Sequence, residues 1–166
     1  RYFDSEEWKL GQYSKYSQTL IEVVENEYWR SGYAYYEIPK YLESDFSFST
    51  RFTFSMIHSG LPADGLAFVI HTSNDEIGGG GGGIGYAGIS PSLAVEFDVW
   101  TNGSNRWKDE NGQGEWQVGR EPNNFHIGVM LNGLQTDHYA LNAYPPLKTS
   151  GAIHDAWVEY DGVNKM

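Results

Sequence analysis

Residues 46–56 carry the pattern that most restricts how this chain can fold. Large apolar side chains and one threonine occupy every second position, and small polar or charged side chains occupy the positions between them. The first set comprises Phe46, Phe48, Thr50, Phe52, Phe54 and Met56. Because successive side chains of a strand point to opposite faces, this period of two predicts an antiparallel strand with one face in a core and the other in solvent.

Further segments have the composition of strands, and turn residues separate them. Residues 66–70 are entirely apolar, which predicts a strand buried on both faces, and residues 93–100 place apolar side chains on one face and two acids on the other. Other strands are predicted over residues 20–24, 33–38, 125–131 and 156–160. No segment has a clear helical period. About nine short strands at this spacing predict an all-β fold, a two-sheet β-sandwich or jelly roll.

Three segments between the predicted strands are irregular. Residues 78–83 are consecutive glycines, and no Lys-Ser/Thr pair follows them as it would in a phosphate-binding loop. The polar segment 102–120 is too long and hydrophilic to lie in a core. Asp161-Gly162 predicts a hairpin turn, but the returning strand over 163–166 is short. We therefore expect further strands of the sandwich to be missing at the C-terminal end or supplied by another chain.

Composition narrows the class of protein. A chain of 166 residues suits one domain over residues 1–166, and 16% aromatic residues with 20 glycines favour strands and turns. A formal net charge of −11 argues against nucleic acid and against an anionic membrane surface as partners. The absence of cysteine excludes disulfides and thiolate metal sites. No apolar run approaches the roughly 20 residues that a transmembrane segment needs.

Acidic, amide and imidazole side chains gather around the end of the predicted strand over 93–100. Glu96 and Asp98 are two positions apart and share a face, and Asn102 follows where the strand ends. Glu121 precedes a later predicted strand, and His126 lies near the start of that strand. Two close carboxylates repel each other unless one is protonated or a cation lies between them. Oxygen ligands suit Ca²⁺, and carboxylates with an imidazole suit Mn²⁺ or Zn²⁺. The alternative is that these side chains line a solvated sheet face.

Six segments, taken in order, resemble motifs of the L-type (legume) lectins, and the resemblance extends over most of residues 20–166. It implies a concanavalin-like β-sandwich that binds carbohydrate, depends on metal ions and is not an enzyme. The matching segments are residues 31–35, residues 46–56, the Asp64-Gly65-Leu66-Ala67-Phe68 motif, the glycine run with Ile84-Gly85, residues 94–102 and residues 121–129.

The resemblance also assigns a role in sugar binding to individual residues. The Asp64 carboxylate would accept hydrogen bonds from two sugar hydroxyls, the Gly83 backbone N–H would donate one, and the Asn102 amide would donate another. The ring of Trp100 or Phe125 would stack on the apolar face of the sugar. The family also has a cis peptide bond before the motif aspartate, which would be the Ala63–Asp64 bond here.

The metal ligands follow from the same resemblance. A transition ion, Mn²⁺ or a similar metal, would be held by Glu96, Asp98, Glu121 and His126. Ca²⁺ would be held by Asp98, Asn102, Glu121 and the carbonyl of Trp100. Ions held in this way would fix a carboxylate and an amide in the orientation that a sugar needs.

Two features depart from the family pattern. Glu121 stands where the family has an aspartate, so its carboxylate is one methylene further from the backbone. The segment between Asn102 and Glu121 is longer than in typical plant lectins, and its acids Asp109, Glu110 and Glu115 are alternatives to Glu121 as ligands.

Two other functions compete with sugar binding. Jelly-roll glycosidases carry a third acid after the pair on the same strand, whereas this chain has Trp100 and Thr101 there, which argues against hydrolysis. The second alternative is a lectin-fold structural or adhesive module that does not bind sugar. For a lectin, we expect glycans or glycoproteins as partners, a location outside the cell or in the secretory pathway, and association into homo-oligomers through sheet faces.

Overall fold

The computed structural model describes residues 5–11, 13–17, 19–58, 60–74, 77–102, 106–108, 115–117, 125–135, 140–142, 147 and 149–164. Strands dominate these residues, and the only helical elements among them are two 3-10 turns, η1 (Ser5–Glu7) and η2 (Gly81–Gly83). None of the described helical elements has the length and apolar character needed to cross a membrane. The prediction of an all-β fold is therefore confirmed.

The alternating segment forms β5 (Phe48–Ile57), which pairs in antiparallel fashion with β12 (Ser150–Tyr160). Exposure along β5 alternates at every residue, and the phenylalanines occupy the less exposed positions as the pattern predicts. The outer face of the pair carries Arg51, which donates to the Asp155 carboxylate at 2.8 Å, and Thr53, which donates to the same oxygen at 3.0 Å. These cross-strand contacts link the exposed faces of β5 and β12.

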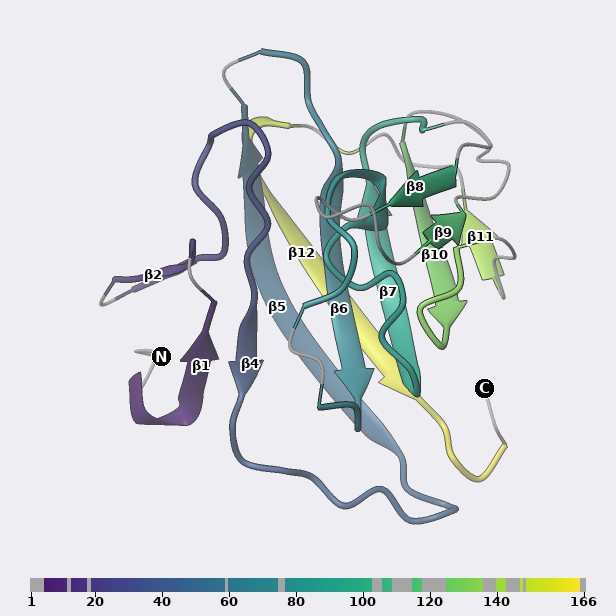
Figure 1. Cartoon of the computed structure of the whole chain (residues 1–166). Helices are drawn as coiled ribbons and strands as arrows, with labels where there is room; N and C mark the ends of the chain where they lie inside the picture. Colours follow the sequence, from purple (N-terminus) through teal and green to yellow (C-terminus); the bar gives the residue numbers. More distant parts are fainter. Residues whose placement is uncertain are drawn as a thin grey trace.

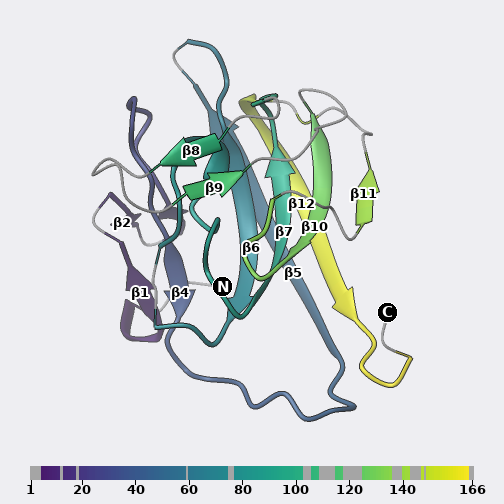
Figure 2. The same cartoon turned by 45° about the vertical axis from the view of Figure 1, so that its right-hand side comes forward.

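A second, four-stranded sheet has the order β11-β10-β7-β6 and is antiparallel throughout. Its strands are β6 (Gly65–His71), β7 (Ser92–Asp98), β10 (His126–Leu131) and β11 (Ala140–Asn142). The β5–β12 pair lies behind β6, β7 and β10, so that the two sheets form the layers of a sandwich (Figures 1 and 2).

Apolar side chains pack on both faces of the four-stranded sheet. Between the sheets, Phe97 and Val99 pack with Ala156 of β12 and with Phe52 and Phe54 of β5. On the opposite face, Ala94 of β7 and Met130 of β10 pack with Tyr86 and Ile89 from the loop that follows the glycine run. Strand β7 is therefore covered on both sides, and its acidic face is buried rather than solvated.

Smaller antiparallel pairs complete the described structure. β1 (Trp8–Leu10) pairs with β4 (Ala34–Tyr36), and β2 (Lys15–Tyr16) pairs with β3 (Ile21–Glu22). β8 (Arg106–Lys108) and β9 (Glu115–Gln117) form a hairpin near the end of the four-stranded sheet where β6 begins and β7 ends (Figures 1 and 2).

Three details differ from the sequence-based expectations. β6 is only half-buried along its length, because one of its edges has no neighbouring strand among the described residues. The polar segment after Asn102 contains the β8–β9 hairpin, which its composition did not reveal. Residues 163 and 164 belong to a turn, so the part of the predicted returning strand that the structure describes is not a strand.

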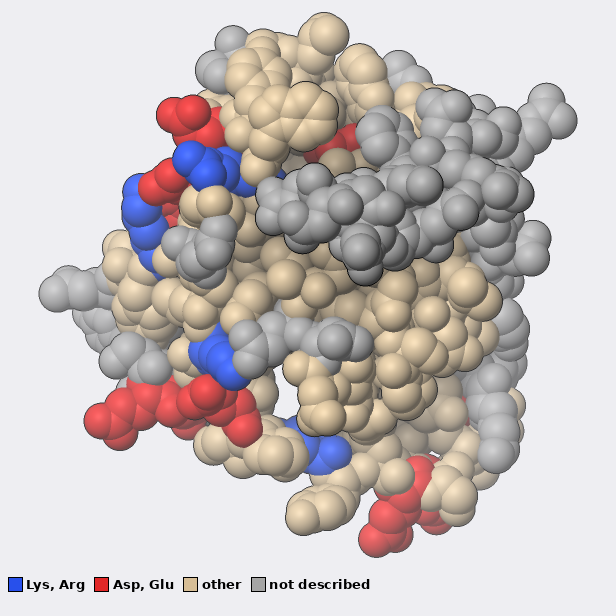
Figure 3. All heavy atoms as spheres, in the orientation of Figure 1, with Lys and Arg blue, Asp and Glu red and all other residues tan. Residues whose placement is uncertain are grey.

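The surface shows how the strongly negative net charge is distributed. On the face seen in Figure 3, acidic side chains gather in separate groups near the margins, with lysine or arginine beside some of them. Lys15 and Glu25 form one ion pair, and Arg51 and Asp155 form another at 2.8 Å. Four polar groups that the sequence predicts to act together lie elsewhere, around the end of β7. All four are buried, and they are Glu96, Asp98, Asn102 and His126.

Candidate functional site

The site is built on the face of β7 that points away from β5 and β12. Glu96 and Asp98 lie on this face, and each has only 2% of its surface exposed. In the sheet, Asp98 is paired with Gly65 of β6 on one side and with His126 of β10 on the other. The register of three strands therefore brings the acids of one motif beside the histidine of another, as the sequence predicts.

Glu96 is the centre of a buried polar group. His126 Nε2 lies 3.2 Å from Glu96 Oε1, and the Tyr86 hydroxyl donates to Glu96 Oε2 at 2.5 Å. Tyr86 is fully buried and His126 is 1% exposed. Burial raises the pKa of Tyr86 well above its usual value, and the neighbouring Glu96 charge raises it further, so the phenol stays protonated and remains a donor.

Asp64 and Asn102 meet at the edge of this group. The Asn102 side-chain amide donates to Asp64 Oδ1 at 3.1 Å, and the Val99 backbone N–H donates to the Asp64 carbonyl at 2.9 Å. The Ala63–Asp64 peptide bond is cis, as the resemblance implies. Burial raises the pKa of Asp64, and the hydrogen bond from Asn102 partly opposes that effect.

The glycine run forms a tight turn that covers Asn102. Gly82 and Gly83 of η2 are buried, and Ile84 ends the turn in the left-handed region with φ 45°. A Cβ atom on Gly82 would lie 2.6 Å from the Asn102 side-chain amide, so this position accepts no side chain without displacing Asn102. The Gly83 N–H, predicted to donate to a sugar, donates to the Gly80 carbonyl at 3.0 Å within the turn.

The remaining predicted residues lie at different distances from this cluster. The Trp100 backbone N–H donates to Asp98 Oδ1 at 2.7 Å, which places Trp100 directly beside the acids. Phe125 packs against the apolar core between the sheets, a position that suits structural packing. Glu121, Asp109 and Glu110 lie outside the described residues, and the side chain of Glu115 is not described.

The buried side chains suit a divalent cation in their chemistry. Two carboxylates and an imidazole are hard or intermediate ligands, and burying carboxylates is costly unless an ion or hydrogen bonds compensate for the lost water. Within the described part of the chain, however, no three His, Asp or Glu side chains converge as a metal-binding group. Glu96 and His126 are in contact, while Asp98 Oδ1 accepts the Trp100 N–H. The described residues thus bring two acids and a histidine together without forming a metal-binding group of three.

Sequence reasoning missed two residues of the cluster, Tyr86 and Gln135. Gln135 follows the β10 strand, is 3% exposed, and donates through Nε2 to the Gly82 carbonyl at 2.8 Å. Neither residue lies in a recognisable ligand spacing. The contact of Tyr86 with Glu96 joins residues 10 positions apart in sequence, and that of Gln135 with Gly82 joins residues 53 positions apart. Only the tertiary arrangement brings them to the site.

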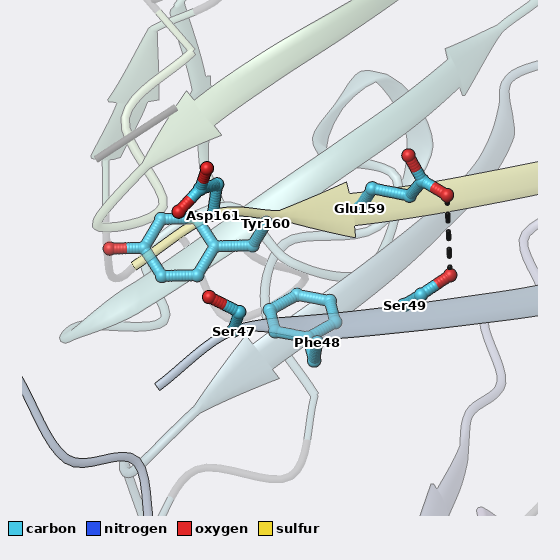
Figure 4. Close-up of a pocket in the computed structure, with 6 residues that line it drawn as sticks. All are labelled: Ser47, Phe48, Ser49, Glu159, Tyr160 and Asp161. Carbon is cyan, nitrogen blue, oxygen red and sulfur yellow. Dashed lines mark hydrogen bonds between the residues drawn. The ribbon is translucent and has the colours of Figure 1, made fainter. Parts of the chain in front are cut away.

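A hollow at the opposite end of the β5–β12 pair does not have the features of a binding site. Figure 4 shows that its two acids lie on β12 or just beyond it. Glu159 accepts the Ser49 hydroxyl at 3.4 Å, and Asp161 accepts the backbone N–H groups of Val163 and Asn164 at 3.0 and 3.1 Å. Its lining consists of Ser47, Phe48, Ser49, Glu159, Tyr160 and Asp161. Local hydrogen bonds therefore already occupy both carboxylates.

Comparison with known proteins relates this arrangement to one family. The model of the legume lectin domain matches residues 2–166. The basic agglutinin of Psophocarpus tetragonolobus is 33% identical over 127 residues, which amount to 75% of this chain and 43% of that protein. The chain therefore spans less than half the length of this relative.

Two solved structures have the same fold. The crystal structure of basic winged bean lectin with Tn-antigen superimposes with a TM-score of 0.71 and 27% identity, covering 96% of this chain and 66% of that one. The lectin from Bauhinia forficata in complex with GalNAc gives a TM-score of 0.75 and 26% identity, covering 96% of this chain and 69% of that one. The predicted β-sandwich is thereby confirmed.

Proposed function

Because this chain belongs to the legume lectin family, we propose that it binds carbohydrate at the Asp64–Asn102 pair and the glycine turn, and that divalent cations support the binding. The observation that carries the proposal is the contact between the two side chains. The Asn102 amide donates to Asp64, and the turn packs so closely on Asn102 that no side chain fits at Gly82. A carboxylate and an amide held in this way present an acceptor and a donor without further ordering.

The proposed role of each residue in sugar binding follows from its position. Asp64 accepts hydrogen bonds from sugar hydroxyls, Asn102 donates one through its amide, and the N–H of Gly83 lies in the adjoining turn. Trp100 is the better candidate than Phe125 for stacking on the sugar, since Phe125 packs into the core. The carboxylate of Asp64 and the amide of Asn102 are polar groups, which suit a hydrophilic ligand.

The cation site is proposed next to this pocket. Glu96, Asp98 and His126 would hold a transition ion such as Mn²⁺, and Asp98, Asn102 and the Trp100 carbonyl would hold Ca²⁺, with Glu121 as a further ligand of both. A bound ion would supply positive charge that compensates the buried carboxylates. The protein itself contributes the strand register that places His126 beside Asp98.

We further propose that the domain binds sugar without cleaving it. Retaining and inverting glycosidases need two carboxylates free to face opposite sides of the glycosidic bond. Here Glu96 is enclosed by Tyr86 and His126, and Asp98 accepts the Trp100 N–H. A location outside the cell or in the secretory pathway accords with this function, because glycans and free Ca²⁺ occur there.

Calorimetric titration with N-acetylgalactosamine tests the proposal. This sugar is the first choice because the Bauhinia forficata lectin was solved in complex with it. We expect saturable binding in Ca²⁺ and Mn²⁺, loss of binding after treatment with a chelator, and recovery when the ions return. A glycan array then defines the preferred sugar. Absence of binding to every glycan in the presence of both ions would instead favour a lectin-fold structural or adhesive module.

A further inference from the structure

Two buried polar residues, Tyr86 and Gln135, have no part in the proposed sugar pocket or ion site. Tyr86 lies just after the glycine turn and is fully buried, yet its hydroxyl points to Glu96 Oε2 at 2.5 Å. Gln135 lies after β10, and its amide donates to the Gly82 carbonyl at 2.8 Å. Burying a phenol hydroxyl and a primary amide is unfavourable unless their hydrogen bonds are satisfied, so these contacts contribute to the order of the site.

Tyr86 also contacts the glycine turn through its backbone. Its N–H donates to the Gly83 carbonyl at 3.0 Å, next to the Gly82 carbonyl that accepts the Gln135 amide at 2.8 Å. The Tyr86 hydroxyl donates to Glu96 Oε2, and Glu96 Oε1 lies 3.2 Å from His126 Nε2. Hydrogen bonds therefore connect the turn to Glu96 and His126 through Tyr86, while Gln135 holds the neighbouring carbonyl of the same turn.

At its other end, the same turn touches the proposed sugar pocket. The site of a Cβ on Gly82 lies 2.6 Å from the Asn102 amide, and Asn102 donates to Asp64 at 3.1 Å. A run of glycines has more freedom to lose on folding than any other sequence, so a turn of this kind needs outside contacts to hold one conformation. Gln135 supplies such a contact from a different loop.

We propose that Gln135 and Tyr86 are positioning residues that tie the glycine turn to Glu96, so that ion binding and the conformation of the sugar pocket depend on each other. The link rests on the proposed function, since it joins the proposed ion site to the proposed sugar pocket. Residues around a metal ligand orient it and commonly change ion affinity when they are replaced. Energetic coupling between two sites is reciprocal, so the sugar strengthens ion binding by the same factor.

Hydrogen exchange on the ion-free protein tests the tie itself, independently of sugar binding. The variants are Tyr86→Phe, which removes only the hydroxyl, and Gln135→Met, which keeps the length of the side chain without its donors. Tyr35→Phe is the matched control, because Tyr35 is half-buried on β4 beside His71, at the end of β6 remote from Asp64. We expect faster exchange in residues 79–86 in both test variants, with β5 and β12 unchanged and the control like the wild type.

Wild-type exchange rates in residues 79–86 of both test variants would overturn the proposal. If either variant lowers the protection of β5 and β12 as well, the variant that combines Tyr86→Phe with Gln135→Met decides whether the two residues act on the turn together. Two residues that hold adjacent carbonyls of one turn share that turn as a partner, so their effects on its exchange are non-additive, whereas two independent losses of stability add. Additive effects would therefore also count against the tie.

Titration with Mn²⁺ and N-acetylgalactosamine tests the coupling. We expect Tyr86→Phe to lower Mn²⁺ affinity about tenfold, and to shrink the factor by which Mn²⁺ raises sugar affinity. A residue with a merely structural role would weaken sugar binding equally with and without the ion, and that result would overturn the coupling. A wild-type protein that binds no sugar even with both ions would contradict the proposed function, while the exchange measurement would still decide whether the tie exists.

Discussion

Asp64 supplies the carboxylate of the proposed sugar pocket. It lies between solvent and the buried cluster, its carboxylate accepts the Asn102 amide at 3.1 Å, and its carbonyl accepts the Val99 N–H at 2.9 Å. The second contact involves the backbone alone, so a change of the side chain leaves it in place. The role of Asp64 in binding can therefore be separated from its role in the fold.

Asp64→Asn keeps the shape of the side chain and removes its charge. We expect sugar affinity to fall by at least tenfold, because hydrogen bonds to a charged group contribute roughly 1.5–3 kcal/mol each. The melting temperature should not fall, since the burial that raises the pKa of Asp64 disfavours its charged form. Calorimetry and thermal melting check both results, with the exposed Asp45→Asn as control. Wild-type affinity in the Asp64 variant would exclude this carboxylate from the pocket.

Gly82→Ala tests the packing of the turn on Asn102. The new methyl group would lie 2.6 Å from the Asn102 amide, and forcing such a contact costs typically 1–3 kcal/mol. We expect a lower melting temperature and weaker sugar binding. Gly60→Ala is the control, because its Cβ would meet only the end of the Tyr28 side chain, at 3.0 Å. Equal melting temperatures for the two variants would show that the turn does not pack on Asn102 as described.

At the scale of strands, local patterns predicted much of the structure and long-range contacts supplied the rest. The period of two in β5 and the shared face of Glu96 and Asp98 on β7 were predicted, because neighbours along one strand determine them. The burial of that acidic face was not, because the covering loop with Tyr86 and Ile89 comes from another part of the fold. The contact of Gln135 with Gly82 joins residues 53 positions apart, which no local pattern encodes.

The pair of β5 and β12 gives a pH-dependent prediction. Hydrogen bonds from Arg51 and then Thr53 lower the pKa of Asp155 below its usual value of 3.8. A lowered pKa in the folded state stabilises the fold above that usual value, and the stabilisation disappears as pH falls through the lowered pKa. We expect wild type to have a higher melting temperature than Asp155→Asn at neutral pH, and this gap between the two melting temperatures to close in acid. In an Arg51→Gln background the gap should be much smaller at every pH; a gap that is independent of pH would contradict the assignment.

Across the whole molecule, the two sheets enclose one apolar core, and the loop with Tyr86 and Ile89 covers the opposite face of β7, where the site lies. The chain corresponds to 69% of the Bauhinia forficata lectin chain, and its inner-facing side chains on β5 are only half-buried. The sequence-based expectation that a further segment or a second chain completes the sandwich stays a prediction. We expect this chain to form a homo-oligomer or a complex with such a partner. Sedimentation or light scattering measures that association.

Ion binding should stabilise the whole fold, because the proposed ligands come from β7, β10 and the segments beside them and are assembled only in the native state. An ion present at about one hundred times its Kd adds about 2.7 kcal/mol to the free energy of unfolding. We therefore expect the melting temperature to fall in a chelator and to recover with Mn²⁺ and Ca²⁺. His126→Ala should abolish the response to Mn²⁺. An identical melting curve with and without chelator would argue against ions that bind the folded protein.

The most direct measurement is anomalous X-ray scattering from crystals grown with Mn²⁺, Ca²⁺ and N-acetylgalactosamine, with data collected near the manganese absorption edge. We expect an anomalous peak beside Glu96, Asp98 and His126, and sugar density against Asp64, Asn102 and the glycine turn. Crystals that hold the sugar at another surface, or that show no peak beside these acids at saturating Mn²⁺, would contradict this expectation.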